Sequence, residues 1–96
     1  MFESWRVAAD LSAWQGPDVD AGAAKAGGVE AWWLRCGYGD DRHPEARRYQ
    51  FGKDGMFDRY RQRAKAAGLP FGFYIFPIPH ASTPQATFHA VMRYTR

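Results

Sequence analysis

An apolar run that ends in a carboxylate is the first place where this sequence could do chemistry. Residues 7–16 read Val-Ala-Ala-Asp-Leu-Ser-Ala-Trp-Gln-Gly, so Asp10 comes where a short predicted strand gives way to a turn at Gly16. In parallel α/β proteins the ligand lies at the carboxyl ends of the strands, so an acid at this point faces the site. Asp10 is therefore the first candidate for a reacting group. The alternative is that Asp10 caps the turn, because Asp often bonds to nearby backbone N–H groups.

Three apolar runs and three helical patterns alternate along the chain. One apolar run lies at the start of residues 7–16, and the other two cover residues 29–37 and 71–77. The helical patterns are a short one that ends at residue 26, one over residues 56–67 and one over residues 84–95. Strands that alternate with helices in this way form right-handed βαβ units on a parallel sheet. The sequence predicts an α/β fold of the order β-α-β-α-β-α in one domain, residues 1–96, with no second domain.

Residues typical of helix ends border these helical patterns. The predicted N-caps are Asp18 or Asp20, Asp54 and Thr83, with Pro84 at the first helical position of the last helix and Gly68 just after the second.

The sequence also makes predictions for the last helix and for the polar segment that precedes Gly55. In the last helix, the spacing places Phe88, Val91, Met92 and Thr95 on one face. The polar segment between the second strand and Gly55 is predicted to be a long loop at the rim of the site, since loops of that length are usually functional or disordered.

The cysteine and histidine content gives no metal site. Cys36 is the only cysteine and lies in an apolar run, so an internal disulfide is excluded and a buried thiol is expected. His43, His80 and His89 are scattered, without the spacing of metal ligands. We therefore expect no metal and no cofactor.

Four segments, in order, carry a family resemblance. They are Asp10-Leu11-Ser12-Ala13-Trp14-Gln15-Gly16, the glycine-bounded residues 28–39, Asp54 with Phe57, and residues 64–74, which read AKAAGLPFGFY. Together they resemble the first half of a family 25 glycoside hydrolase, the lysozyme family often carried by phage lysins and bacterial autolysins. The resemblance covers nearly the whole chain and implies half of an irregular TIM-like (β/α) barrel.

This resemblance implies a site that cleaves the β-1,4 bond after N-acetylmuramic acid in peptidoglycan. Asp10 matches a first-strand aspartate of the acidic catalytic cluster, and Tyr74 matches a tyrosine that lines the same pocket. The remaining residues expected to bind substrate are Trp14, Tyr38, Phe76 and Asp54. For Trp14, Tyr38 and Phe76 the alternative is simple core packing, whereas a tyrosine hydroxyl at a strand end needs a polar partner.

The chain also departs from the family's pattern. Glycoside hydrolysis needs two carboxyl groups that flank the bond, and the family takes its general acid from an Asp-x-Glu pair on a fourth strand. No carboxylate follows Asp58 here, and Ile75 stands where many members carry His. Asp40 and Asp41 lie in the predicted loop and are poor substitutes. Hydrolysis is therefore expected of the complete protein and not of these 96 residues.

A non-catalytic structural or cell-wall-binding component, such as a phage tail protein that keeps part of the lysozyme fold, is the alternative function. The formal net charge of +3 also allows a nucleic-acid partner. That function ranks third, because the basic residues of the second helix are better explained as a solvated face. These residues are Arg59, Arg61, Arg63 and Lys65.

The expected partners are peptidoglycan glycan strands. The third strand would have an unpaired edge, so the rest of a longer chain or a neighbouring subunit is expected to cover it. The sequence begins without the basic and apolar regions of a signal peptide and contains no apolar run of roughly 20 residues, the length of a membrane helix. We expect a soluble protein of a phage particle or a released lysin, acting at the bacterial cell wall.

Overall fold

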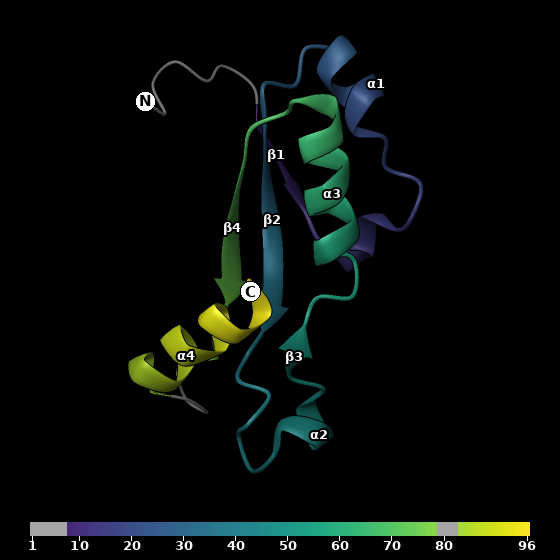
Figure 1. The fold of residues 1–96 in the computed structure, drawn as a ribbon. Helices are drawn as coiled ribbons and strands as arrows, with labels where there is room; N and C mark the ends of the chain where they lie inside the picture. Colours follow the sequence, from purple (N-terminus) through teal and green to yellow (C-terminus); the bar gives the residue numbers. More distant parts are fainter. Residues whose placement is uncertain (1–7, 79–82) are drawn as a thin grey trace.

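The fold is a small mixed sheet with helices packed on it (Figure 1). The computed structural model describes residues 8–78 and 83–96. In chain order the elements are β1 (Ala8–Leu11), the 3₁₀ turn η2 (Ala13–Gln15), α1 (Ala21–Ala26), β2 (Ala31–Tyr38), α2 (Ala46–Tyr49), β3 (Gly52–Lys53), α3 (Phe57–Ala67), β4 (Phe71–Phe76) and α4 (Pro84–Tyr94).

β2 is the central strand of the sheet. β4 pairs with it in parallel from Trp32 to Tyr38, and this pairing occupies one edge of β2. β1 pairs in parallel with the first half of β2, and β3 pairs antiparallel with Gly37 and Tyr38. A strand has two edges, so β1 and β3 must lie end to end along the other edge of β2.

The α/β class and the three predicted parallel strands are confirmed, and helices lie where the three helical patterns predicted them. The expectation of a purely parallel sheet was wrong, because β3 is antiparallel. The segment predicted to be one long loop also contains α2. This segment folds because Phe51 is buried in a small cluster with Ala46 and Ile78, beside Tyr38.

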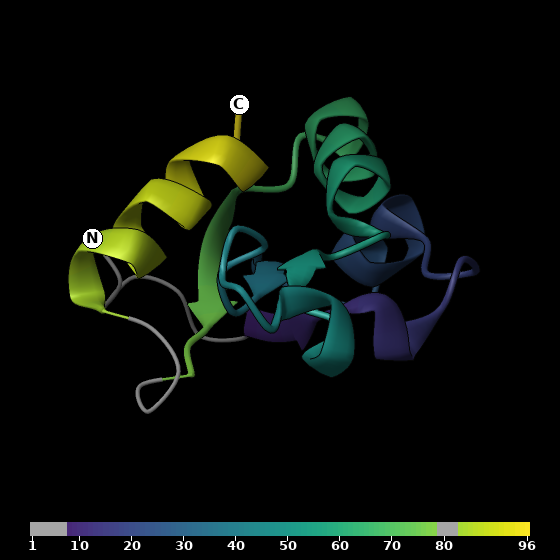
Figure 2. The same ribbon diagram turned by 90° about the horizontal axis from the view of Figure 1, so that it is seen from below.

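The two faces of the sheet have different environments. On one face Trp32, Leu34 and Cys36 of β2 form a core with residues of α3 and α4, among them Tyr60 and Tyr94. Figure 2 shows α3 and α4 on this same side of the sheet. Side chains alternate along a strand, so the opposite face carries the intervening residues. We call this the open face; it carries Asp10, Trp33, Arg35, Gly72, Tyr74 and Phe76.

The helix ends agree with most of the predictions. Asp20 is the N-cap of α1, with its Oδ1 accepting from Ala23 N at 3.0 Å. Thr83 caps α4 ahead of Pro84, and Gly68 ends α3 in the left-handed conformation that favours glycine, with φ of 67°. The prediction of Asp54 as the N-cap of α3 was wrong.

The N-cap of α3 is Met56, which makes no side-chain capping bond. Asp54 Oδ1 instead accepts from Met56 N at 2.9 Å and closes a turn just before the helix. The helix therefore begins two residues later than the Asp54 cap implied.

Only part of the predicted apolar face of α4 lies against the core, where Val91 packs. Ala90 and Tyr94 are its buried residues, whereas Phe88 is 62% exposed and Met92 is 53% exposed. The physical reason is the fit of Tyr94 against Gly37, where an added Cβ would overlap the tyrosine ring. The Tyr94 hydroxyl also donates to Gly39 O at 2.9 Å and accepts from Asp41 N at 2.9 Å. These contacts turn Phe88 and Met92 away from the core.

In the part of the chain that the structure describes, no helix has the length and apolar character needed to cross a membrane.

Candidate functional site

The open face brings Asp10 and Tyr74 to the same side of the sheet from strands that are far apart in sequence. Asp10 is in register with Trp33 of β2, and Tyr74 is in register with Arg35, two residues further along that strand. β1 and β4 flank β2, so their backbones lie about 10 Å apart at the usual strand spacing. Arg35 and Tyr74 therefore lie on the same face of the sheet as Asp10, two register positions further along β2.

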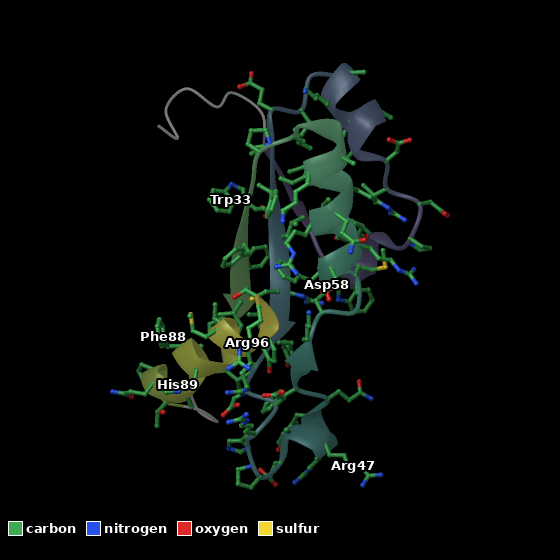
Figure 3. The ribbon with its side chains drawn as sticks, viewed as in Figure 1. Trp33, Arg47, Asp58, Phe88, His89 and Arg96 are labelled. Carbon is green, nitrogen blue, oxygen red and sulfur yellow. The ribbon has the colours of Figure 1, made fainter. Side chains whose placement is uncertain are left out.

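The floor of the open face is aromatic. The ring of Trp33 lies across Gly72 of β4, since a Cβ at that glycine would overlap the indole. In Figure 3 the labelled Trp33 reaches toward β4 from the central strand. Glycine is therefore required at position 72 to let this ring lie flat on the neighbouring strand.

The electrostatics of Tyr74 link it to Asp10. Burial raises the pKa of the Tyr74 hydroxyl above its ordinary value of 10.0, and the negative charge of Asp10 raises this pKa further. The Arg35 cation lowers the same pKa, and the Asp54 carboxylate adds a smaller rise. The hydroxyl therefore keeps its proton at neutral pH and can donate it to a ligand oxygen, while Asp10 offers a neighbouring acceptor.

The turn after β1 is fixed by Ser12 and Gln15, not by Asp10. Ser12 caps η2 and accepts from Trp14 N at 3.3 Å, while Gln15 Oε1 accepts from Ser12 N at 2.6 Å. The hydroxyl of Tyr60, on α3, donates to the backbone carbonyl of Gly16. None of the hydrogen bonds between described residues uses the Asp10 carboxylate. Among the described residues, Asp10 therefore does not cap this turn; Ser12 and Gln15 do.

Trp14 lies at the surface of that rigid turn. Trp14 is 86% exposed, more than any other large hydrophobic residue in the described part of the chain. Simple core packing, the alternative considered for Trp14, is therefore wrong. An exposed indole on a fixed turn is suited to stacking against a flat apolar surface, such as the face of a sugar ring.

Asp54 is buried behind this turn and links three elements. Its Oδ2 accepts from Ala13 N at 2.9 Å and forms an ion pair with Arg35, whose Nη2 lies at 2.9 Å and Nε at 3.0 Å. Its backbone N–H donates to Cys36 O, also at 2.9 Å. The side chain is only 1% exposed. The structure thus gives Asp54 a role in joining η2, β2 and the start of α3, while its contact with a substrate stays a prediction.

Arg35 is a residue of the site that sequence reasoning missed. It is the one charged residue in β2, a strand that is otherwise apolar or aromatic. That signal was present in the sequence, because a cation inside a buried strand needs a charged partner. The partner, Asp54, is 19 residues away and could not be identified from spacing.

Tyr38 and Phe76 extend the site toward the carboxyl ends of β2 and β4. Their ring centroids are 5.4 Å apart, and Tyr38 also contacts Phe51 at 5.5 Å. Tyr38 is thus largely held in the small cluster around Phe51, whereas Phe76 remains half exposed. Of these two predicted substrate contacts, Phe76 has more surface available.

Asp40 and Asp41 lie away from the open face and are occupied by Arg93 of α4. Arg93 Nη2 lies 2.8 Å from Asp40 Oδ1 and also bonds to Asp41. These ion pairs fasten α4 to the segment after β2. Neither carboxylate therefore lies beside Asp10 as a second catalytic group.

The described residues contain no group of three or more His, Cys, Asp or Glu side chains arranged to hold a metal ion. His43 accepts a hydrogen bond from Glu45 N, and Cys36 is buried, with burial raising the pKa of its thiol. His80 lies outside the described residues.

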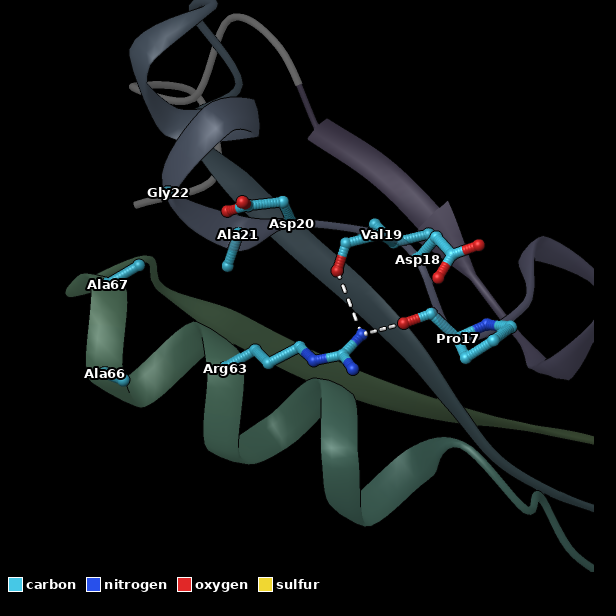
Figure 4. Close-up of a pocket in the computed structure, with 9 residues that line it drawn as sticks. All are labelled: Pro17, Asp18, Val19, Asp20, Ala21, Gly22, Arg63, Ala66 and Ala67. Atoms are coloured by element: carbon cyan, nitrogen blue, oxygen red, sulfur yellow. Dashed lines mark hydrogen bonds between the residues drawn. The ribbon is translucent and has the colours of Figure 1, made fainter.

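A cavity of about 540 Å³ lies elsewhere, between residues 17–22 and α3 (Figure 4). Arg63 spans it and donates to Pro17 O at 2.7 Å and to Val19 O at 3.0 Å. The guanidinium fixes the loop that leads into α1. This cavity lies beside the helices and does not include any of the predicted site residues.

Comparisons with known proteins identify no relative. No protein-family model matches the sequence, and no curated protein or solved structure is significantly similar to it. The function of the open face must therefore be inferred from its own residues.

Proposed function

We propose that the chain is a muramidase-like glycoside hydrolase domain directed at peptidoglycan, with glycan strands bound across the open face. The observation that carries the proposal is that the strand register puts Asp10 of β1 and Tyr74 of β4 on the same face of the sheet. A carboxylate, a protonated phenol and nearby exposed aromatic side chains are the groups that recognise sugar hydroxyls and sugar faces.

The same residues suit binding better than cleavage. Hydrolysis of a glycosidic bond uses one carboxylic acid and one carboxylate on either side of the bond. Asp10 is the only carboxylate in β1, β2 and β4. Asp54 is nearby, but its oxygens already accept from Arg35, Ala13 and Met56. We propose that cleavage of the β-1,4 bond after N-acetylmuramic acid belongs to the complete protein, with these residues supplying one side of the site.

The architecture supports placing this sheet in an irregular β/α barrel. β1, β2 and β4 are parallel and lie side by side in the sheet with β2 in the middle, and the core that covers them from α3 and α4 lies on one face. In a barrel the helices lie outside and the site lies at the carboxyl ends of the strands. The open face would then line the interior, and η2, which follows β1, would lie at the rim of the site.

Co-sedimentation with insoluble peptidoglycan tests the proposal. The wild-type chain should pellet with the wall material, and Tyr74→Phe, which removes only the hydroxyl, should bind roughly 2- to 10-fold more weakly. Tyr49→Phe, an exposed tyrosine on α2, is the matched control. A wild-type chain that stays in the supernatant, or a Tyr74→Phe variant that binds as tightly as Tyr49→Phe, would contradict the proposal.

A non-catalytic wall-binding or structural role is the second candidate, favoured by the single carboxylate on the three parallel strands. The two candidates differ in the complete protein, where a turbidity assay on bacterial cell walls separates them. Clearing of the suspension that depends on Asp10 supports the hydrolase. Binding of the complete protein without clearing supports the structural role.

A further inference from the structure

The three parallel strands carry two charged residues, Asp10 on β1 and Arg35 on β2, and both lie on the open face. Arg35 is neutralised there by Asp54, whose Oδ2 lies 2.9 Å from Nη2 and 3.0 Å from Nε. Asp10 forms no ion pair and no hydrogen bond with another residue that the structure describes. Within the described part of the chain, the open face therefore carries one negative charge that no neighbouring cation offsets.

This charge is opposite in sign to that of the whole chain. The chain has a formal net charge of +3, so a negative potential at the open face is a local feature. Burial is the main cause that raises the pKa of the Tyr74 hydroxyl. Among the charges, Asp10 raises this pKa more than Arg35 lowers it, and Asp54 adds a smaller rise. A ligand group beside Tyr74 and Asp10 therefore experiences a negative potential.

Aromatic rings lie on the same face as this carboxylate. Tyr74 is 36% exposed and Phe76 is 50% exposed, and Trp33 lies across Gly72, the glycine that precedes them on β4. The faces of aromatic rings attract organic ammonium groups. An ammonium group also donates a charge-assisted hydrogen bond to a carboxylate, which is stronger than one from a neutral hydroxyl or amide. The open face is thus better matched to a positively charged group than to a neutral one.

We propose that the open face binds a primary ammonium group of its ligand, held by Asp10 beside the rings of Tyr74 and Phe76. This inference rests on the proposed binding of glycan strands at the open face and adds the charge of the group that is recognised. Two parts of a peptidoglycan strand supply such a group. One is a glucosamine that has lost its acetyl group, and the other is a lysine side chain in the attached peptide.

Calorimetric titration with two matched pairs of soluble probes tests this inference, at about pH 6, where amines are protonated and an exposed aspartate is ionised. One pair is a β-1,4-linked glucosamine tetrasaccharide and its N-acetylglucosamine counterpart. The other is a lysine-containing muropeptide with N-acetylated sugars and the same muropeptide acetylated at the lysine Nζ. In at least one pair, the wild-type chain should bind the amine roughly 3- to 10-fold more tightly than the acetylated form. The pair that shows this preference identifies the source of the ammonium group.

Asp10→Asn separates the charge of this side chain from its shape. The variant keeps the size of the side chain and its capacity for hydrogen bonds, so it should bind the amine and the acetylated form of each pair equally. Asp18→Asn removes the same charge at another exposed aspartate and should keep the wild-type preference. A preference that Asp10→Asn retains, or one that Asp18→Asn loses as well, would overturn the inference.

Failure of this inference is distinguishable from failure of the proposed function. A wild-type chain that pellets with peptidoglycan but prefers neither amine, or binds none of the four probes, overturns the ammonium site alone. A wild-type chain that stays in the supernatant and binds none of the probes overturns both.

Discussion

The carboxylate of Asp54 binds the guanidinium of Arg35 through one oxygen, Oδ2, which lies 2.9 Å from Nη2 and 3.0 Å from Nε. The same oxygen accepts from Ala13 N at 2.9 Å, so the ion pair also holds the turn that presents Trp14. Arg35 in turn lies beside Tyr74 on the open face. The Asp54 carboxylate thus holds both the turn that carries Trp14 and the side chain of Arg35.

Removal of the Asp54 carboxylate should destabilise the fold strongly. Asp54→Ala leaves Arg35 without its buried partner and leaves the N–H groups of Ala13 and Met56 without acceptors. We expect the free energy of unfolding to fall by about 3–5 kcal/mol, as for other broken buried ion pairs. Urea unfolding followed by circular dichroism measures the change. Asp18→Ala, at an exposed aspartate, is the control and should stay within about 0.5 kcal/mol of wild type.

A methyl group at Gly37 should displace α4. In Gly37→Ala the new Cβ overlaps the ring of Tyr94, so either the helix shifts or the strand distorts. Overpacking of this kind costs about 1–3 kcal/mol, which thermal unfolding detects. Gly52→Ala is the matched control, because nothing lies within 4 Å of a Cβ at that position in the neighbouring strand. Equal melting temperatures for the two variants would show that α4 does not pack on Gly37.

The buried hydroxyl of Tyr94 should make stability depend on alkaline pH. Burial is the main cause that raises the pKa of Tyr94 from 10.0 to about 12. The folded state therefore holds this proton more tightly than the unfolded state. The resulting stabilisation is complete below pH 10 and is lost as the pH rises toward 12.

Tyr94→Phe isolates this effect, because other groups with a raised pKa, such as Tyr60, are common to both proteins. The free energy of unfolding of the wild-type chain should fall by about 2 kcal/mol more than that of Tyr94→Phe between pH 10 and pH 12. Urea titrations at a series of pH values measure this difference. Parallel pH profiles for the two proteins would contradict a buried, protonated Tyr94.

Trp14 should contribute to glycan binding and not to stability. Its side chain is exposed, so Trp14→Ala should change the free energy of unfolding by no more than about 0.5 kcal/mol. The loss of one stacking surface should weaken binding to soluble peptidoglycan fragments roughly 3- to 10-fold, the equivalent of about 1 kcal/mol. Calorimetric titration measures both proteins. Phe88→Ala removes another exposed aromatic ring and should bind as wild type does.

The sequence predicted the parts of the fold that depend on local signals. The strands around Asp10, Trp33 and Tyr74 follow apolar runs, and Asp20 and Thr83 cap helices where short polar side chains precede helical spacing. Each of these features is decided by neighbours in sequence. The spacing of apolar residues and the capping residues are therefore sufficient to locate these strands and helix ends.

The features that the sequence did not predict depend on distant contacts. α4 turns Tyr94 inward because Gly37, 57 positions earlier, leaves room for its ring. Asp54 is a buried link because Arg35 and Ala13 converge on it from two other segments. β3 is only two residues long and has no apolar pattern of its own. Of the candidate site, the family resemblance predicted that Asp10 and Tyr74 lie on one side of the sheet, but the ion pair of Arg35 with Asp54 was not predicted.

The role of Asp10 is the central claim, and affinity for a soluble muramic acid-containing oligosaccharide tests it most directly. Asp10 is exposed on the open face and makes no hydrogen bond with the other described residues, so Asp10→Ala should fold as wild type does. We predict that calorimetric titration finds binding by Asp10→Ala at least about 10-fold weaker than wild type, while Asp18→Ala binds as wild type does. Equal affinities for Asp10→Ala and Asp18→Ala would contradict a sugar-binding role for Asp10.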